Sequence, residues 1–198
     1  MSHLQQYIIG KMRGEGYHGR EGHPGAYDAL DVAARLIRPQ SYLEIGVYDG
    51  GSLFSVLRAS PQMNRLVLCD LFGHDWISWG IGNGGAAPGT HAHIDKLLAH
   101  LNYRGQVDFM VGDSREMVPK VQGPFDMAFV DGDHSHDIAF TDAMNAYPLV
   151  RPGGLLVMDD SSRSEVAAAI GELKDKVSLR HLFTIEDGFD ATSVFEKV

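Results

Sequence analysis

The chain has 198 residues, of which 44% are hydrophobic and 22% are charged, a composition that fits one globular domain with a sizeable core and argues against disorder. Its formal net charge of -9 argues against nucleic acid as a partner, because binding to a phosphate backbone needs clustered Lys and Arg. The chain has a single cysteine, Cys69, which excludes an internal disulfide and a cysteine-based zinc site. It shows neither a secretion signal nor an apolar stretch of bilayer length, so we predict a cytoplasmic protein with no membrane partner.

Short apolar runs alternate along the chain with segments of helical spacing, which is typical of parallel strands joined by crossover helices. We predict helices over 26–37, 52–60, 91–102, 137–149 and 163–176, with a short one after 113. Strands are predicted over 41–46, 65–70, 107–113, 125–131, 153–160, 179–185 and 193–198. No repeat or linker interrupts this series, so we expect a single domain over 1–198 with an N-terminal arm of about 25 residues.

The stretch 71–90 contains both tryptophans, Trp76 and Trp79, and shows no periodic pattern. A loop of this length inside a compact domain is usually functional or disordered. Because it follows the carboxyl end of the second predicted strand, we predict a lid or a substrate wall. A surface insertion or an oligomer contact is an equal alternative.

Polar residues recur where the predicted strands end, as at Asp70, Asp113 and Asp131. In a doubly wound parallel sheet all the carboxyl ends lie along one edge, where ligands bind. The first such site, "LEIGVYDGGSL", has a strand, an acid and then Gly46 and Gly50 before a helix, so that backbone N–H groups can approach an anionic ligand. It departs from the dinucleotide fingerprint G-x-G-x-x-G because residue 48 is Tyr, which argues against a nicotinamide oxidoreductase.

Four motifs together resemble those of the class I S-adenosylmethionine-dependent methyltransferases. They are "LEIGVYDGGS", the acid Asp70, "VGDS" at 111–114, and "FVDGDHSHD" followed by "LVRPGGLLVMDD". The last pair resembles the branch of small metal-dependent O-methyltransferases of catechol and glycosyl type. In that branch a Tyr usually stands where this chain has His136.

The resemblance implies a Rossmann-like α/β fold with a doubly wound, seven-stranded, mostly parallel sheet in the order 3-2-1-4-5-7-6, strand seven antiparallel, and helices on both faces. It implies S-adenosylmethionine as the cofactor, with Asp70 on its ribose hydroxyls. The cofactor-binding residues implied in this sequence are Glu44, Gly46, Gly50, Ser52, Asp70, Asp113, Ser114 and Asp131.

Strands four and five would be neighbours in that order, roughly 4.8 Å apart, so Asp131 would face Asp159 and Asp160. Three ionised carboxylates would repel one another, and a hard divalent cation relieves this repulsion. Oxygen ligands favour Mg²⁺, so we predict a magnesium site formed by these three residues. The alternative is that Asp160, with Ser161 and Ser162, caps the helix near 163, while Asp131 contacts only the cofactor.

The chemistry implied by the family is methyl transfer to a hydroxyl group, which needs a base. The position that holds the base in the family is His134, with Asp133 as second candidate. Alternatively, His134 only packs or contacts the cofactor, and we interpret His136 as structural.

The acceptor is left open as a small-molecule sugar, polyketide or catechol-like hydroxyl. The resemblance implies that the N-terminal arm helps to cover the substrate or forms a homodimer contact. The alternative function is a non-catalytic partner protein that binds S-adenosylmethionine.

Overall fold

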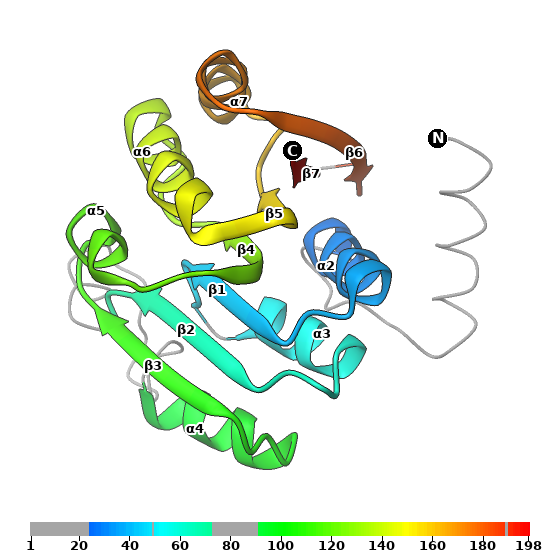
Figure 1. Ribbon diagram of the computed structural model, residues 1–198, viewed down its shortest axis with the longest axis vertical. Helices are drawn as coiled ribbons and strands as arrows, with labels where there is room; N and C mark the ends of the chain where they lie inside the picture. The colour runs from blue at the N-terminus through cyan, green and yellow to red at the C-terminus, as the bar shows by residue number, and fades with distance from the viewer. Residues whose placement is uncertain (1–23, 49, 73–90, 189) are drawn as a thin grey trace.

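The computed structural model describes residues 24–48, 50–72, 91–188 and 190–198, and these form one sheet with helices on both faces (Figure 1). The strand order is β3-β2-β1-β4-β5-β7-β6, and β7 alone runs antiparallel to its neighbours, as predicted. The strands are β1 (Ser41–Ile45), β2 (Arg65–Asp70), β3 (Gln106–Val111), β4 (Phe125–Val130), β5 (Val150–Met158), β6 (Leu179–Glu186) and β7 (Ala191–Lys197).

Each face of the sheet carries its own apolar core, because successive side chains of a strand point to opposite faces. In β2, Leu66 and Leu68 pack on one face, and Val67 and Cys69 pack on the other. The first face is covered by α2 (Pro24–Ile37), α3 (Gly51–Ala59) and α4 (His91–His100). The second is covered by α6 (His136–Ala146) and α7 (Ser164–Lys176), with the short α5 (Ser114–Met117) and a 3₁₀ turn at Val118–Lys120 beside them (Figure 1).

The two largest differences from the predicted element boundaries are at the end of α6 and at the start of β5. The helix predicted over 137–149 ends at Ala146, and Tyr147–Leu149 form a 3₁₀ turn, because Pro148 has no N–H with which to continue an α-helix. Strand β5 begins at Val150, before the Pro-Gly-Gly segment that reads as a turn, and its pairing with β4 shifts register across that segment. It ends at Met158, which leaves Asp159 and Asp160 just beyond the strand.

The N-terminal arm and nearly all of the predicted lid lie outside the described residues, so their roles remain predictions. No helix within the described ranges is long and apolar enough to cross a membrane.

Candidate active site

A cavity of about 380 Å³ opens at the carboxyl ends of β1, β2 and β4. Seven of the residues predicted to bind cofactor or metal or to act in catalysis line it, and the other five, Glu44, Gly50, Ser52, Asp159 and Asp160, do not. Sequence reasoning missed Tyr48 and Arg115 in its wall. The full lining is Ile45, Gly46, Tyr48, Cys69, Asp70, Leu71, Gly112, Asp113, Ser114, Arg115, Asp131, Gly132, Asp133, His134 and Ile138.

The loop that follows β1 approaches the end of β4 so closely that only glycine fits at position 46. Gly46 has a φ of +85°, and a Cβ there would lie 1.9 Å from the carbonyl oxygen of Asp131. Gly50 also has a positive φ, but a Cβ on it would meet Leu97 of α4 at 2.7 Å. Gly46 therefore brings the loop against β4 at the cavity, whereas Gly50 lets α3 start against α4.

Asp70 holds this loop by accepting hydrogen bonds from backbone N–H groups. Its Oδ2 accepts from Val47 (2.6 Å) and Tyr48 (3.0 Å), and its Oδ1 accepts from Phe72 (3.0 Å). The sequence predicted a ribose ligand here. The structure adds a supporting role, because the same carboxylate fixes the loop that lines the cavity.

Glu44 and Ser52 lie beneath the loop. Both are buried, and the Ser52 hydroxyl donates to Oε1 of Glu44. Burial raises the pKa of Glu44 to about 8, so this carboxyl is largely protonated at neutral pH. Their hydrogen bond links the strand before the loop to the helix after it.

Asp113 and Ser114 lie at the side of the cavity formed after β3. The Asp113 side chain caps α5 by accepting from the backbone N–H of Arg115 at 2.9 Å. It also pairs with the Arg115 guanidinium, whose hydrogen bonds lower the pKa of Asp113. Asp113 is therefore an ionised acceptor at the cavity wall.

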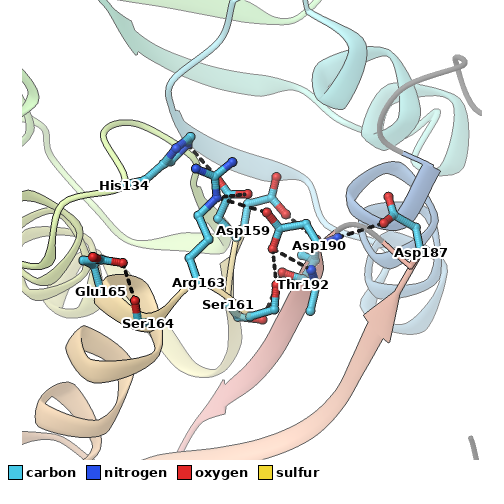
Figure 2. A network of polar contacts seen from close by, with 12 residues as sticks. His134, Asp159, Ser161, Arg163, Ser164, Glu165, Asp187, Asp190 and Thr192 are labelled. Carbon is cyan, nitrogen blue, oxygen red and sulfur yellow. Dashed lines mark hydrogen bonds and ion pairs between the residues drawn. The ribbon is translucent and has the colours of Figure 1, made fainter.

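Two of the three carboxylates predicted to bind magnesium, Asp131 and Asp160, lie close together where β4 and β5 end, with His134 rather than Asp159 as the third group. The backbone N–H of Asp131 donates to Ile45 of β1, and that of Asp159 donates to Val130 of β4, which places the two strand ends side by side. One ligand atom each from Asp131, His134 and Asp160 lie within 4.8 Å of one another. Nε2 of His134 lies 2.5 Å from Oδ2 of Asp160, and Oδ1 of Asp159 accepts from the hydroxyl of Thr192 (Figure 2).

The electrostatics of this cluster suit a divalent cation. Burial raises the pKa of Asp131, and the nearby charges of Asp159 and Asp160 raise it further. Burial likewise raises the pKa of Asp159 to about 6. Carboxyls that resist ionisation because they are buried together are the donors that a hard cation stabilises, so the residues present fit a magnesium ion.

The alternative reading of Asp160 as a helix cap is wrong. The N-cap of α7 is Arg163, and no side chain makes a capping hydrogen bond there. The hydroxyls of Ser161 and Ser162 instead donate to Ala191 and Asp190 at the start of β7.

Arg163 and Asp190 are parts of this cluster that sequence reasoning missed. Nε of Arg163 lies 3.0 Å from Asp160 and 3.2 Å from Asp190 (Figure 2). A signal for Asp190 was present, because the predicted antiparallel strand seven must start beside the end of strand five. Arg163 had no such signal, since an arginine at a helix start reads as solvent-exposed.

The two candidate bases differ in their surroundings. Oδ1 of Asp133 accepts the backbone N–H of Ser135 at 2.7 Å, and this bonding lowers its pKa. The hydrogen bond to Asp160 raises the pKa of His134. His136 does not line the cavity, and its ring contacts Asp137, Glu172 and Phe140 on the surface of α6 and α7.

Comparison with known proteins places this site in a family. Residues 43–161 match a family model described as a methyltransferase domain. A catechol O-methyltransferase from Niastella koreensis is 28% identical over 139 residues, which are 68% of this chain and 55% of that protein. Tapetum-specific methyltransferase 1 from Arabidopsis thaliana is 26% identical over 132 residues, 67% of this chain and 51% of that protein. The chain spans about half the length of the curated relatives it matches.

Solved structures show the same fold. The O-methyltransferase TomG from Streptomyces achromogenes, in complex with S-adenosylmethionine, has a TM-score of 0.64 at 19% identity, over 100% of this chain and 91% of that chain. The N-methyltransferase NodS from Bradyrhizobium japonicum has a TM-score of 0.58 at 15% identity, over 86% and 93% of the two chains. Enzymes with different acceptor atoms therefore share this fold. The family match over more than half of the chain, together with the strand order, shows that this protein belongs to the methyltransferase domain family of class I, S-adenosylmethionine-dependent type.

Proposed function

We propose that the protein is an S-adenosylmethionine-dependent O-methyltransferase that uses Mg²⁺ and acts on a hydroxyl group of a small molecule. The observation that carries this proposal is the position of the carboxylate cluster. Asp131 and His134 line the same cavity as Gly46 and Asp70, and Asp160 pairs with His134 directly behind the wall. A cofactor on the glycine loop and an acceptor at the cluster would thus meet in one cavity.

Relatives support the choice of oxygen as the acceptor atom. Two curated relatives are named caffeoyl-CoA O-methyltransferases, from Stellaria longipes and Zea mays, and a third is a catechol O-methyltransferase. These names favour a catechol-like phenol over a sugar or polyketide hydroxyl. Structural neighbours solved with S-adenosylmethionine or S-adenosylhomocysteine support the cofactor.

The cofactor would lie against the loop after β1. Gly46 leaves the backbone open to close approach, and Asp70 and Asp113 offer ionised or hydrogen-bonding oxygens at the two sides of the cavity. Asp70 already accepts three backbone N–H groups, so its remaining lone pairs are the ones available to ribose hydroxyls. We assign Glu44, Gly50 and Ser52 to supporting this loop.

The proposed metal ligands are Asp131, Asp159 and Asp160. When bound, a divalent cation lowers the pKa of a hydroxyl that it coordinates. The chain's own contribution is to hold these carboxyls together against their repulsion through backbone hydrogen bonds to β1 and β4 and through Thr192. His134 stands beside them with Nε2 toward Asp160.

Of the two candidate bases, we favour His134. The carboxylate of Asp133 is engaged by Ser135 and has a lowered pKa, which makes it a weak base. His134 also lines the cavity, and an imidazole with its usual pKa of about 6.5 can accept a proton at neutral pH. Were Asp160 engaged as a metal ligand, this carboxylate would no longer hold a proton on His134, and the imidazole could take one from the acceptor hydroxyl.

Calorimetric titration with S-adenosylhomocysteine and with NAD, combined with a methyl-transfer assay, tests the proposal. We expect S-adenosylhomocysteine to bind, NAD not to bind, and a catechol or caffeoyl ester to be methylated in Mg²⁺ but not in EDTA. Cofactor binding without transfer to any phenol, catechol or sugar tested would favour the non-catalytic partner. Full turnover in EDTA would exclude the metal and leave His134 to act by proton removal alone.

A further inference from the structure

Arg163 joins two carboxylates that come from different parts of the chain (Figure 2). Its Nε lies 3.0 Å from Oδ1 of Asp160, which follows β5, and 3.2 Å from Oδ2 of Asp190, which precedes β7. The other oxygen of Asp160, Oδ2, faces Nε2 of His134 at 2.5 Å. The two oxygens of Asp160 therefore have different partners: Oδ1 faces Arg163, and Oδ2 faces the cluster of Asp131 and His134.

We propose that Arg163 is a positioning residue of the metal site, which occupies Oδ1 of Asp160 so that Oδ2 stays turned toward Asp131. This inference rests on the proposed function, because it requires the cluster to bind a divalent cation. Ligating carboxylates are commonly held by an outer hydrogen bond that orients them, and loss of such a partner weakens metal binding. Arg163 provides that partner here.

Asp190 is the fixed point from which Arg163 acts. Its Oδ1 accepts from the Ser162 hydroxyl at 2.6 Å and from the Ala191 backbone N–H at 2.7 Å, which leaves Oδ2 for the guanidinium. Because Ala191 begins β7, the bridge ties the loop after β5 to the start of the neighbouring strand. Arg163 is thus anchored on one side and orients Asp160 on the other.

The backbone of Asp160 explains why an anchor is needed. Asp160 has a φ of +52°, in the left-handed region that a non-glycine residue adopts only when its surroundings hold it there. The backbone N–H of Arg163 donates to the carbonyl of Asp160 at 2.9 Å, so the same residue holds both the main chain and the side chain of Asp160. Without the guanidinium, Oδ1 of Asp160 would lose this partner, while Oδ2 would keep His134.

Two effects of Arg163 on a metal ion oppose each other, and they make opposite predictions. Orientation of Asp160 strengthens metal binding, whereas repulsion between the guanidinium and a dication weakens it. Arg163→Lys separates these effects, because lysine keeps the positive charge but lacks the planar fork that can span two carboxylates.

The test is calorimetric titration of the cofactor-free protein with MgCl₂ and with MnCl₂. We expect Arg163→Gln to raise the dissociation constant for both metals about 10- to 100-fold, and Arg163→Lys not to restore it. Asp190→Asn keeps the shape of the anchor and removes its charge, so it should shift metal affinity in the same direction. Arg180→Gln is the matched control, because it removes the same charge from a pair with Glu196 on the strands β6 and β7, outside the cavity lining.

Titration with S-adenosylhomocysteine and a thermal melt accompany each variant, and neither should change beyond the value for Arg180→Gln. Tighter metal binding by Arg163→Gln, with Arg163→Lys unchanged, would show that Arg163 competes with the metal and would overturn the inference. Equal metal affinity in all variants would overturn it as well, while leaving the metal site intact. If the unsubstituted protein binds neither metal but still binds S-adenosylhomocysteine, the metal part of the proposed function fails, and the role of Arg163 fails with it.

Discussion

Replacing Gly46 with alanine tests whether the cofactor loop must touch the end of β4. A single non-glycine residue in the left-handed region costs about 1 to 2 kcal/mol. The new Cβ would lie 1.9 Å from the carbonyl oxygen of Asp131, where ordinary contact begins near 3.4 Å, so the backbone of the loop or of β4 must move by more than an ångström. Such overpacking costs about 1 to 3 kcal/mol. We expect Gly46→Ala to lower the free energy of unfolding by about 2 to 5 kcal/mol.

Urea unfolding of Gly46→Ala beside Gly171→Ala measures this cost. Gly171 lies in α7, and a Cβ there would meet no atom within 4 Å, so alanine should raise the free energy of unfolding by up to about 1 kcal/mol through helix propensity. The same substitution thus has opposite signs at the two sites. Because Gly46 and Asp131 both line the cavity, Gly46→Ala should also weaken S-adenosylhomocysteine binding by about tenfold or more, a loss of roughly 1.4 kcal/mol.

One result would refute the reasoning. If Gly46→Ala and Gly171→Ala unfold at the same urea concentration, and both bind S-adenosylhomocysteine as the unsubstituted protein does, then the loop does not lie against β4. The close approach that defines this wall of the cavity would then be absent.

Three further predictions concern Asp70, His134 and the buried carboxyls. Asp70→Ala removes the acceptor of three backbone N–H groups. It should lower the free energy of urea unfolding by about 3 kcal/mol or more and weaken S-adenosylhomocysteine binding. The control Asp95→Ala changes an exposed residue of α4 and should affect neither quantity. His134→Gln should lower methyl-transfer turnover about 100-fold with unchanged S-adenosylhomocysteine affinity, and an unchanged turnover would exclude it as the base. Burial raises the pKa of Glu44 to about 8 and that of Asp159 to about 6, above their usual 4.5 and 3.8, so the unfolded chain releases these protons first. Their contribution to stability is full below pH 4 and is lost as the pH rises through 6 and 8, so melting temperatures in EDTA should fall across this range, and a rise would contradict the assignment.

Much of the fold could be predicted because its signals are local. Apolar runs of strand length alternated with helical spacing, and the acids at 70, 113 and 131 followed strands whose carboxyl ends meet at one edge of a parallel sheet. The family resemblance implied the strand order, and that order places the end of β4, with Asp131, beside the end of β5, with Asp159 and Asp160. The boundaries that were misplaced most, at Ala146 and Val150, are where proline and glycine compete with the regular pattern.

The sequence by itself determined the fold class, the edge of the sheet that holds the site and the residue types gathered there. Only the tertiary structure decided what each side chain faces: Asp70 accepts backbone N–H groups of the loop, Asp159 turns toward Thr192, and His134 pairs with Asp160. It also brought Arg163 to Asp190 across 27 residues of sequence. The physical reason is that the period of a segment depends on its own residues, whereas the partner of a polar side chain depends on which distant strand end the sheet places beside it.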